Sequence, residues 1–467
     1  MTSMAEIEKY TYKIAKKIRI RIPDMPGALG KIATELGRHG AVLGDITKVH
    51  LTSHYITRDV ILFFDDEKQF SDTMSGLENL RGYKIISIED EALRIHRGGK
   101  IAVTPTVRVE TLSDLRMVYT PGVAQVCNYI VRHPEAAREY TSIGNSVCIA
   151  TNGSAILGLG DIGVRAGMPV MEGKSLILHK MAGISCVPLL VDTDDADRMV
   201  DTLAVVSKTF SVIMIEDIRA PLCFEVEERL QERIQIPVFH DDQHGTATVI
   251  LAALLNALKV TGRHKGDIKI VISGAGAAGM ATGKMLLEYG FRHITLCDRK
   301  GAIYRGRPGN RDAYKDSIAE MTNRAAEEGP LHEIIKGKDV FIGVSAAGLV
   351  SQDMVRSMRS NPIVFALANP FPEILPADAL EAGAVVALDG RTVNNSLIFP
   401  GIIRGTLDAG ASRITYPMKF SAAETLASLA GKHEIVPDFM NPLVHRRVAE
   451  AVQLAGHRAG KGSKTAT

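Results

Sequence analysis

The feature that most constrains the fold of this chain is a glycine-rich turn near its middle. The apolar run KIVIS (269–273) leads into GAGAAG, and a helical segment follows as far as Gly290. A strand, a GxGxxG turn and a helix in this order build the phosphate-binding turn of a dinucleotide domain, because the helix N-terminus presents free N–H groups to a pyrophosphate. We therefore predict a Rossmann-type domain. Its cofactor-binding turn is formed by Gly274, Gly276, Ala277, Ala278 and Gly279.

An acid at the end of the next strand completes the pattern. Asp298 closes the run ITLCD, about 20 residues after the glycines, where a carboxylate accepts hydrogen bonds from the adenosine ribose hydroxyls. This position favours NAD. Arg299 and Lys300 follow directly and would suit the 2′-phosphate of NADP, which is the alternative.

A second GxGxxG lies upstream and shows how little the pattern means by itself. Its glycines are Gly158, Gly160 and Gly163 in ILGLGDIG. Gly167 and Pro169 follow in VRAGMPV, and both residue types argue against a long helix. We expect this segment to be a tight loop with another use.

The rest of the chain is organised around the dinucleotide domain. With 467 residues it is too long for one ordinary core, and 46% hydrophobic with 23% charged residues is typical of a globular protein. Short apolar runs alternate with helical segments in the C-terminal half, which predicts buried parallel strands and an α/β fold. We predict three domains, 1–97, 98–244 and 245–467, the last with C-terminal helices.

The N-terminal 97 residues read as a separate small module. Strand-like and helix-like runs follow one another as β-α-β-β-α-β, which is the ferredoxin-like order. Its first turn, DMPGAL (24–29), leads into the helical run ALGKIATELGRHG. With this turn the module resembles the ACT family of regulatory domains, and the resemblance implies an amino-acid effector bound where the turn meets a partner subunit. A plain dimerisation module without a ligand is the alternative.

Charge and composition exclude several classes of partner. The net charge is +2, with basic and acidic residues mixed along the whole length, and Trp is absent. This leaves no basic field for nucleic acid. Five cysteines without a CxxC pair are typical of reduced intracellular thiols. No leader segment and no apolar run of about 20 residues is present, so we expect a cytoplasmic protein with no membrane partner.

Two pairs of adjacent acids follow apolar runs that end as strands. Glu216 and Asp217 come after VIMI, and Asp241 and Asp242 come after PVFH. Adjacent carboxylates repel one another unless water or a cation neutralises them. A solvated loop edge and a site for a hard cation such as Mg²⁺ or Mn²⁺ both explain such pairs. Histidines flank the second pair and raise zinc or iron as an alternative, but they lack the spacing of helical zinc motifs.

Seven short blocks decide between these interpretations. They are VYTPGVA (118–124), LGLGDIG (157–163), MPVMEGK (168–174), IEDIRAP (215–221), FHDDQHGTA (239–247), ALANP (366–370) and NNSLIFPG (394–401). In this order they resemble the blocks of bacterial malic enzymes over roughly residues 104–440, and HDDQHGTA and VMEGK are highly specific to that family. The resemblance implies an α/β malic-enzyme N-domain ahead of the Rossmann domain. It also implies oxidation and decarboxylation of malate to pyruvate and carbon dioxide, with NAD or NADP and a divalent cation.

The resemblance assigns roles to residues that composition alone would leave ordinary. Glu216, Asp217 and Asp242 become the metal ligands. Lys174 becomes the base for the malate hydroxyl, with Asp241 as its partner, and Tyr119 becomes the acid that protonates C3. A lysine near a cation can shift its pKa from about 10.4 toward neutrality, which would suit it to proton transfer. These catalytic residues are Tyr119, Lys174 and Asp241.

Polar residues in the later blocks are expected around the malate carboxylates and the cofactor. The expected substrate residues are Asn369, Asn394 and Asn395, and Ser345 joins Asn369 and Asn395 on the cofactor side. A capping or turn role is the alternative for the asparagines. Arg165, Lys180 and Arg404 are cations in or near the matched blocks, and the choice among them as carboxylate partner stays open.

Two positions depart from the family pattern. Asn152 stands where an acid is expected, which we take to be neutral, and Ala155 stands where larger members carry a substrate arginine. The second departure leaves recognition of the malate carboxylate open.

Three other functions remain as alternatives. A malolactic enzyme shares these blocks and would yield lactate, a plain hydroxyacid dehydrogenase would release no carbon dioxide, and an inert amino-acid sensor would keep the fold without the chemistry. Retention of the catalytic and metal residues argues against the last. A homo-oligomer, dimer or higher, is expected because such N-terminal modules commonly pair.

Overall fold

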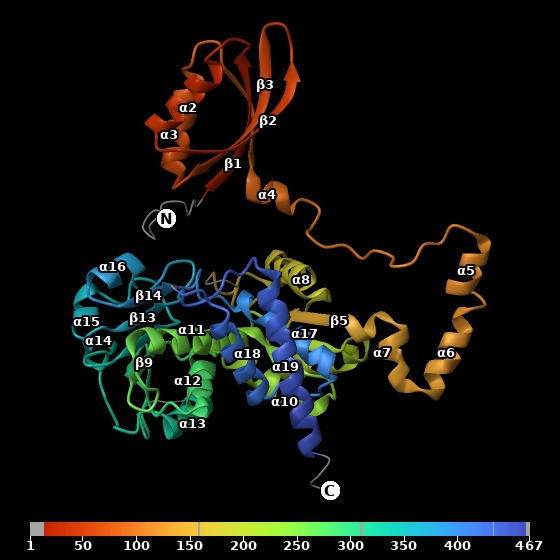
Figure 1. The fold of residues 1–467 in the computed structure, drawn as a ribbon, viewed down its shortest axis with the longest axis vertical. Helices are drawn as coiled ribbons and strands as arrows, with labels where there is room; N and C mark the ends of the chain where they lie inside the picture. The colour runs from red at the N-terminus through yellow and green to blue at the C-terminus, as the bar shows by residue number, and fades with distance from the viewer. Residues whose placement is uncertain (1–13, 157–158, 309–311, 433, 464–467) are drawn as a thin grey trace. The chain divides into compact units, whose positions relative to one another are not determined.

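The computed structural model describes residues 14–156, 159–308, 312–432 and 434–463 (Figure 1). The N-terminal segment 1–13, where no leader was expected, and Gly158 of the upstream glycine motif lie outside these residues. The chain divides into two compact units, with the division between Ala102 and Val103. The further division of the second unit at residue 245 remains a prediction.

The first unit is an antiparallel sheet with helices on one face. Its strand order is β2-β3-β1-β4, the order of the ferredoxin-like split βαβ fold. Isoleucines 18, 20 and 22 alternate along β1 and pack with Ile32 and Leu36 of α2, because successive side chains of a strand point to opposite faces. Assignment to the ACT family remains a prediction. The elements are β1 (Ile14–Pro23), α2 (Ala28–Arg38), β2 (Val42–Leu51), β3 (Tyr55–Phe64), α3 (Glu67–Glu78), β4 (Lys84–Asp90) and α4 (Glu91–His96).

The second unit begins with short helices and a four-stranded parallel sheet. The strands are β5 (Ser146–Thr151), β6 (Ser185–Leu190), β7 (Val212–Ile215) and β8 (Val238–His240), in the order β6-β5-β7-β8. Every residue of β5, β7 and β8 is buried, as expected for parallel strands covered on both faces. The helical elements of this part are α5 (Leu112–Val118), α6 (Val123–Arg132), η1 (Pro134–Ala136), α7 (Ala137–Tyr140), η2 (Ser142–Asn145), η3 (Val164–Gly167), α8 (Met168–Ala182), α9 (Ala196–Val206), η4 (Ser207–Thr209) and α10 (Leu222–Arg233).

Helix α8 corrects one prediction. We argued against a long helix after the upstream glycine motif, yet α8 runs for 15 residues from Met168 to Ala182. Pro169 lies at its first turn, where the missing N–H would have no helical partner and the fixed φ already suits a helix. Because Pro169 lies in the first turn of the helix, the prediction that it would argue against a long helix was wrong.

The second sheet of this unit has the expected Rossmann-type arrangement. Its order is β11-β10-β9-β12-β13-β14. Strand β9 pairs in parallel with β10 on one side and β12 on the other, so the strand order reverses there, where α/β sheets bind ligands. The elements are β9 (Lys269–Ser273), α12 (Ala277–Tyr289), β10 (His293–Asp298), β11 (Gly301–Ala302), α13 (Ala313–Met321), α14 (Leu331–Ile334), β12 (Val340–Gly343), α15 (Gln352–Arg356), β13 (Ile363–Ala366), α16 (Pro376–Glu381) and β14 (Val386–Asp389).

Helix α11 (Thr246–Thr261) connects the two sheets. It follows η5 (Asp241–Gly245), a single π-helical turn, and packs against α12 and α18. Among the described helices, the stretch Asp241–Thr261 is long and apolar enough to cross a membrane, but its apolar residues belong to the hydrophobic core that runs from Val147 to Val452. We therefore assign it as a core helix. The remaining elements are η6 (Asn395–Leu397), α17 (Phe399–Ala409), α18 (Tyr416–Ser428) and α19 (Pro442–Ser463).

Candidate active site

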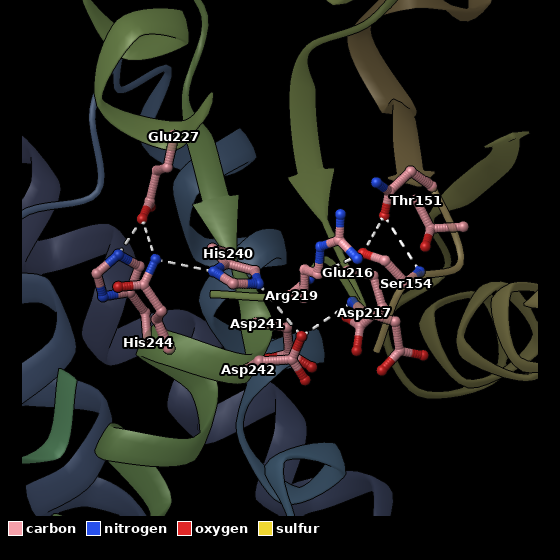
Figure 2. Close-up of polar contacts among 12 residues, drawn as sticks. Thr151, Ser154, Glu216, Asp217, Arg219, Glu227, His240, Asp241, Asp242 and His244 are labelled. Atoms are coloured by element: carbon pink, nitrogen blue, oxygen red, sulfur yellow. Dashed lines mark hydrogen bonds and ion pairs between the residues drawn. The ribbon is translucent and has the colours of Figure 1, made fainter. Parts of the chain in front are cut away.

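The carboxyl ends of β7 and β8 bring the two acid pairs together (Figure 2). Glu216 and Asp217 follow β7, and Asp242 follows β8 as the second residue of η5. One ligand-type oxygen from each of these three side chains lies within 4.8 Å of the others. Parallel strands end at the same edge of their sheet, which is why acids 25 residues apart meet here.

The backbone around Asp217 is held in an uncommon conformation. Its φ is 52°, in the left-handed region that costs a non-glycine residue about 1–3 kcal/mol. Its N–H donates to Asp242 Oδ2 at 2.9 Å, and its carbonyl accepts from the Ala155 N–H at 3.0 Å. The Arg219 N–H donates to Ser154 Oγ at 3.0 Å. These bonds tie the loop after β7 to its neighbours and make its geometry rigid.

The acid cluster fits a hard divalent cation. Glu216 is 2% exposed, and its Oε2 is buried without a hydrogen-bond partner among the described residues. Burial and the neighbouring Asp242 carboxylate raise the pKa of Glu216 well above its usual range, and the Lys174 ammonium offsets only part of this rise. A cation bound by these oxygens would supply the missing partner, and an all-oxygen set is what Mg²⁺ or Mn²⁺ prefers.

The histidines of the motif have other partners, which argues against the zinc or iron alternative. His240 Nε2 lies 3.2 Å from Asp242 Oδ2 and its Nδ1 lies 2.8 Å from Gln243 Nε2. His244 Nε2 lies 2.7 Å from Glu227 Oε1. Both rings take part in a hydrogen-bond network behind the acids.

Lys174 of α8 reaches the same cluster. Its Nζ lies 2.5 Å from Asp241 Oδ2 and 2.8 Å from Glu216 Oε1, and 5.0 Å from the centre of the Phe399 ring. Burial alone would lower the pKa of Lys174, but the facing carboxylates of Asp241 and Glu216 raise it. The carboxylates of the protein by themselves thus favour the charged form of Lys174.

Asp241 contacts Lys174 as the family resemblance implied, and Gly245 makes room for it. Asp241 is fully buried. A Cβ on Gly245 would lie 1.9 Å from Asp241 Oδ1 and 3.3 Å from the Asn395 Cβ. Position 245 therefore requires glycine, because Asp241 approaches its backbone too closely for a side chain. Asn395 lies beside the same turn.

Tyr119 is not brought to Lys174. It lies at the end of α5 and is 66% exposed. Neither α5 nor α6, whose residues are all described, contains a buried residue. The Tyr129 ring of α6 contacts that of Tyr140 in α7, but the described chain covers neither helix.

The predicted dinucleotide turn has the required close approaches. Gly274 has φ 116°, and a Cβ there would lie 2.6 Å from the Val344 carbonyl oxygen. A Cβ on Gly279 would lie 1.8 Å from the Gly274 oxygen. Helix α12 begins at Ala277 with no side-chain cap, which leaves its first N–H groups for a ligand. Ser345 lies across the turn, with its Oγ 3.1 Å from Ser273 Oγ.

Asp298 is surrounded by donors from its own chain. The Lys300 N–H and Arg307 Nη1 donate to Oδ1 at 2.9 and 3.0 Å. Arg307 Nη2 and Lys315 Nζ donate to Oδ2 at 2.7 and 2.9 Å. A carboxylate has about four lone-pair sites, so a ribose hydroxyl must displace one of these donors to be accepted. Sequence reasoning had considered only Arg299 and Lys300.

The asparagines have distinct environments. Asn394 caps η6, accepting from the Ser396 N–H at 2.9 Å and donating to the Gly390 oxygen at 3.3 Å. Asn369 also adjoins Gly390, since a Cβ there would lie 3.1 Å from its Nδ2. The capping alternative therefore describes Asn394 in the structure.

The contacts of Asn152 and Arg404 show the roles of these two residues in the structure. Asn152 donates to the Thr193 oxygen at 3.0 Å and accepts from Ser154 Oγ at 2.6 Å, so it organises the loop after β5 without a charge. Arg404 pairs with Asp408 and Asn145, away from the acid cluster. Sequence reasoning missed Arg219, which lies two residues after Asp217 in IEDIRAP and forms an ion pair at 3.2 Å with Asp194.

Comparisons with known proteins agree with this architecture. Residues 98–231 match the model of the malic enzyme N-terminal domain, and residues 243–393 match that of the malic enzyme NAD binding domain. The chain is 41% identical over 457 residues to the NAD-dependent malic enzyme of Geobacillus stearothermophilus, covering 96% of this chain and 95% of that protein. It is 46% identical to the bifunctional malic/malolactic enzyme of Bacillus subtilis, covering 80% of this chain and 93% of that protein.

A solved structure supports the same assignment. The malic enzyme of Pyrococcus horikoshii superimposes with a TM-score of 0.76 at 40% sequence identity, covering 79% of this chain and 90% of that one. The family models together span more than half of the chain. This protein therefore belongs to the malic enzyme family.

Proposed function

We propose that this enzyme oxidises malate with NAD and a divalent cation, Mg²⁺ or Mn²⁺, and releases pyruvate and carbon dioxide. The observation that carries the proposal is the largely buried acid cluster with Lys174 in direct contact with Asp241 and Glu216. Turn η5, which bears Asp242, packs against α12, the helix that begins at the dinucleotide turn. Cation and cofactor would thus be held by adjoining elements.

The residues present divide the chemistry between them. A cation held by Glu216, Asp217 and Asp242 would supply Lewis-acid polarisation of the malate hydroxyl and of the ketone that follows. Lys174 takes the proton of the 2-hydroxyl while hydride leaves C2 for the nicotinamide, and Asp241 orients the lysine. After the carbon–carbon bond breaks and carbon dioxide leaves, Tyr119 gives C3 its proton, which requires that assembly with a second copy bring this exposed side chain to the site. One proton is taken and one is returned, so the reaction balances.

The charge state of Lys174 must change for this role. The carboxylates facing it hold it protonated, and a divalent charge on the same carboxylates would weaken that effect. Arg219, on the loop of the metal acids, is our candidate for binding a malate carboxylate in place of the arginine that Ala155 replaces.

The exposed position of Tyr119 supports assembly into a homo-oligomer, a dimer or higher. The apolar side chains of α5 and α6, among them Leu112, Met117 and Val131, are 74%, 72% and 78% exposed. Such surface is costly in water, and a second copy of the chain is the partner we propose to cover it. We further propose a cytoplasmic location and an effector role for the first unit.

The cofactor preference follows from the charges around Asp298. Its carboxylate favours the free ribose of NAD, but Arg307 and Lys315 offset its charge. We therefore infer that NAD is preferred and that NADP is rejected only weakly.

A spectrophotometric assay tests the proposal. Malate with Mn²⁺ and NAD should produce reduced nicotinamide steadily, with one carbon dioxide trapped for each turnover, and removal of Mn²⁺ with a chelator should stop both. Lactate formation without net reduction would instead show a malolactic enzyme, the alternative that the Bacillus subtilis relative keeps open. Reduced nicotinamide without carbon dioxide would show a plain dehydrogenase.

A further inference from the structure

A chain of buried and half-buried polar side chains runs from helix α18 to the acid cluster (part of it in Figure 2). Its members, in order, are Lys419, His244, Glu227, Gln243, His240 and Asp242. The contacts are Lys419 Nζ to His244 Nδ1 at 2.9 Å, His244 Nε2 to Glu227 Oε1 at 2.7 Å, Glu227 Oε2 to Gln243 Nε2 at 2.7 Å, Gln243 Nε2 to His240 Nδ1 at 2.8 Å, and His240 Nε2 to Asp242 Oδ2 at 3.2 Å.

The burial of this chain calls for an explanation. Glu227 is 5% exposed and Lys419 6%, and both lie within the hydrophobic core. Burying an acid and a base is costly even when both are hydrogen-bonded. The proposed reaction uses neither residue. Their contribution must therefore come through the groups to which they are joined.

The hydrogen bonds of the chain have a single direction. The Gln243 amide nitrogen carries two hydrogens and accepts nothing, so it donates both, to Glu227 and to His240 Nδ1. His240 Nδ1 is then an acceptor, and the ring proton lies on Nε2 and is donated to Asp242. The opposite orientation of the Gln243 amide is unfavourable, because it would place the amide oxygen next to the Glu227 carboxylate, and both groups are acceptors.

The second histidine is held in the same tautomer. The Lys419 ammonium has only hydrogens to offer, so His244 Nδ1 accepts and its Nε2–H donates to Glu227. A proton on His240 Nδ1 would meet the Gln243 hydrogens, so the geometry places the His240 proton on Nε2, facing Asp242.

This direction determines how Asp242 is presented. Its Oδ2 receives two donors, the Asp217 N–H at 2.9 Å and His240 Nε2 at 3.2 Å. With Oδ2 held in this way, the carboxylate cannot rotate freely and its remaining lone pairs face the cluster. Outer groups of this kind orient metal ligands in many proteins.

We propose that Glu227 and Lys419 are positioning residues that orient Asp242 as a cation ligand through Gln243 and the two histidines. The proposal rests on the cation site of the proposed function. It makes affinity for the cation depend on α18, a helix with no residue in the site itself.

Glu227→Gln is the sharpest test because it keeps the shape and reverses the hydrogen bonds. In this variant the oxygen of residue 227 must face His244 to accept its hydrogen bond, so the amide nitrogen of residue 227 faces Gln243. Gln243 must then rotate its amide, which brings its oxygen rather than its nitrogen toward His240. His240 would carry its proton on Nδ1 and aim an Nε2 lone pair at Asp242. Lys419→Met, which removes the donor to His244, provides a second variant.

The matched control is Lys338→Met. Lys338 is also buried, at 4% exposure, and it pairs with Glu327 and Thr295 in the Rossmann part of the unit. Loss of a buried lysine as such is therefore common to Lys419→Met and Lys338→Met. Only Lys419→Met breaks the chain to Asp242.

Two readouts decide the proposal. The first is the Mn²⁺ affinity of the full chain, measured by calorimetry. It should fall about 10- to 100-fold in Glu227→Gln and Lys419→Met and stay unchanged in Lys338→Met. The affinity for NADH should stay constant in all three variants. The ¹⁵N spectrum of labelled histidines, with His240 identified from His240→Gln, should show the proton on Nε2 in the unmodified protein and on Nδ1 in Glu227→Gln.

The failures are distinguishable. If the unmodified protein binds no Mn²⁺, the cation site of the proposed function is wrong and this inference falls with it. If the unmodified protein binds Mn²⁺ and both variants bind it equally well, or if the control loses as much affinity, only the positioning role is wrong. Should a variant fail to fold, a His240 ring protonated on Nδ1 in the unmodified protein would still overturn the proposal.

Discussion

Replacing Lys174 with methionine should separate stability, cation affinity and catalysis. The change removes the ammonium that lies 2.5 Å from Asp241 and 2.8 Å from Glu216, while methionine keeps most of the volume. Two buried carboxylates are then left without their counter-charge. Breaking a buried ion pair on one side costs about 3–5 kcal/mol, so the cation-free protein should unfold at clearly lower temperature.

The same change should strengthen cation binding. Lys174 competes with a divalent ion for the charge of Glu216, so its removal should lower the Kd for Mn²⁺, and added Mn²⁺ should recover part of the lost stability. Turnover should nevertheless fall by about 10²–10⁴-fold, the usual contribution of a general base. NADH should still bind, since the dinucleotide turn is untouched.

The assay combines thermal unfolding with and without Mn²⁺, Mn²⁺ titration and initial rates. Lys208→Met, which changes an exposed lysine of η4, is the control and should resemble the unmodified protein in all three. An unchanged melting temperature without Mn²⁺, or a rate within a few-fold of the unmodified enzyme, would refute the reasoning.

Three further changes test other parts of the structure. Gly245→Ala places a Cβ 1.9 Å from Asp241 Oδ1 and should abolish turnover by displacing Asp241; kinetics close to those of the unmodified enzyme would mean that the turn can relax. Lys315→Ala frees one acceptor site on the Asp298 carboxylate for the ribose of NAD. The ratio of kcat/KM for NAD to that for NADP should rise a few-fold, equivalent to about 0.5–1 kcal/mol; a shift toward NADP would contradict this. If the first unit is regulatory, an amino acid should change the rate of the full chain, and removal of residues 1–95 should abolish that response; a response that survives the removal would place the effector elsewhere.

Much of the fold could be predicted from local patterns. The run KIVIS, the glycines after it and the helix to Gly290 appear in the structure as β9, the turn and α12. The acids at 216, 217 and 242 meet because each follows a strand of one parallel sheet. Both features depend on backbone sterics and on the alternation of side chains over a few neighbouring residues. Such local patterns can be recognised in the sequence without knowledge of the fold.

The prediction about the segment after the upstream glycine motif was wrong because a residue type does not show where a helix begins. Proline predicts a helix break, yet Pro169 lies in the first turn of α8. Whether a proline starts or breaks a helix depends on where the first turn falls, and this placement follows from packing against the sheet. The position of the helix start was therefore not readable from the residue type.

Which groups neutralise which charges depends on the packing of the folded chain. Asp298 is saturated by Arg307 and Lys315, Lys174 faces the carboxylates of Asp241 and Glu216, and Lys419 reaches His244 across 175 positions of the chain. Electrostatic interactions depend on distance in space and on burial, and neither is written in sequence spacing. The residue types and their order therefore predict which chemical groups the family site contains, whereas the packing of distant helices sets the charge and orientation of those groups.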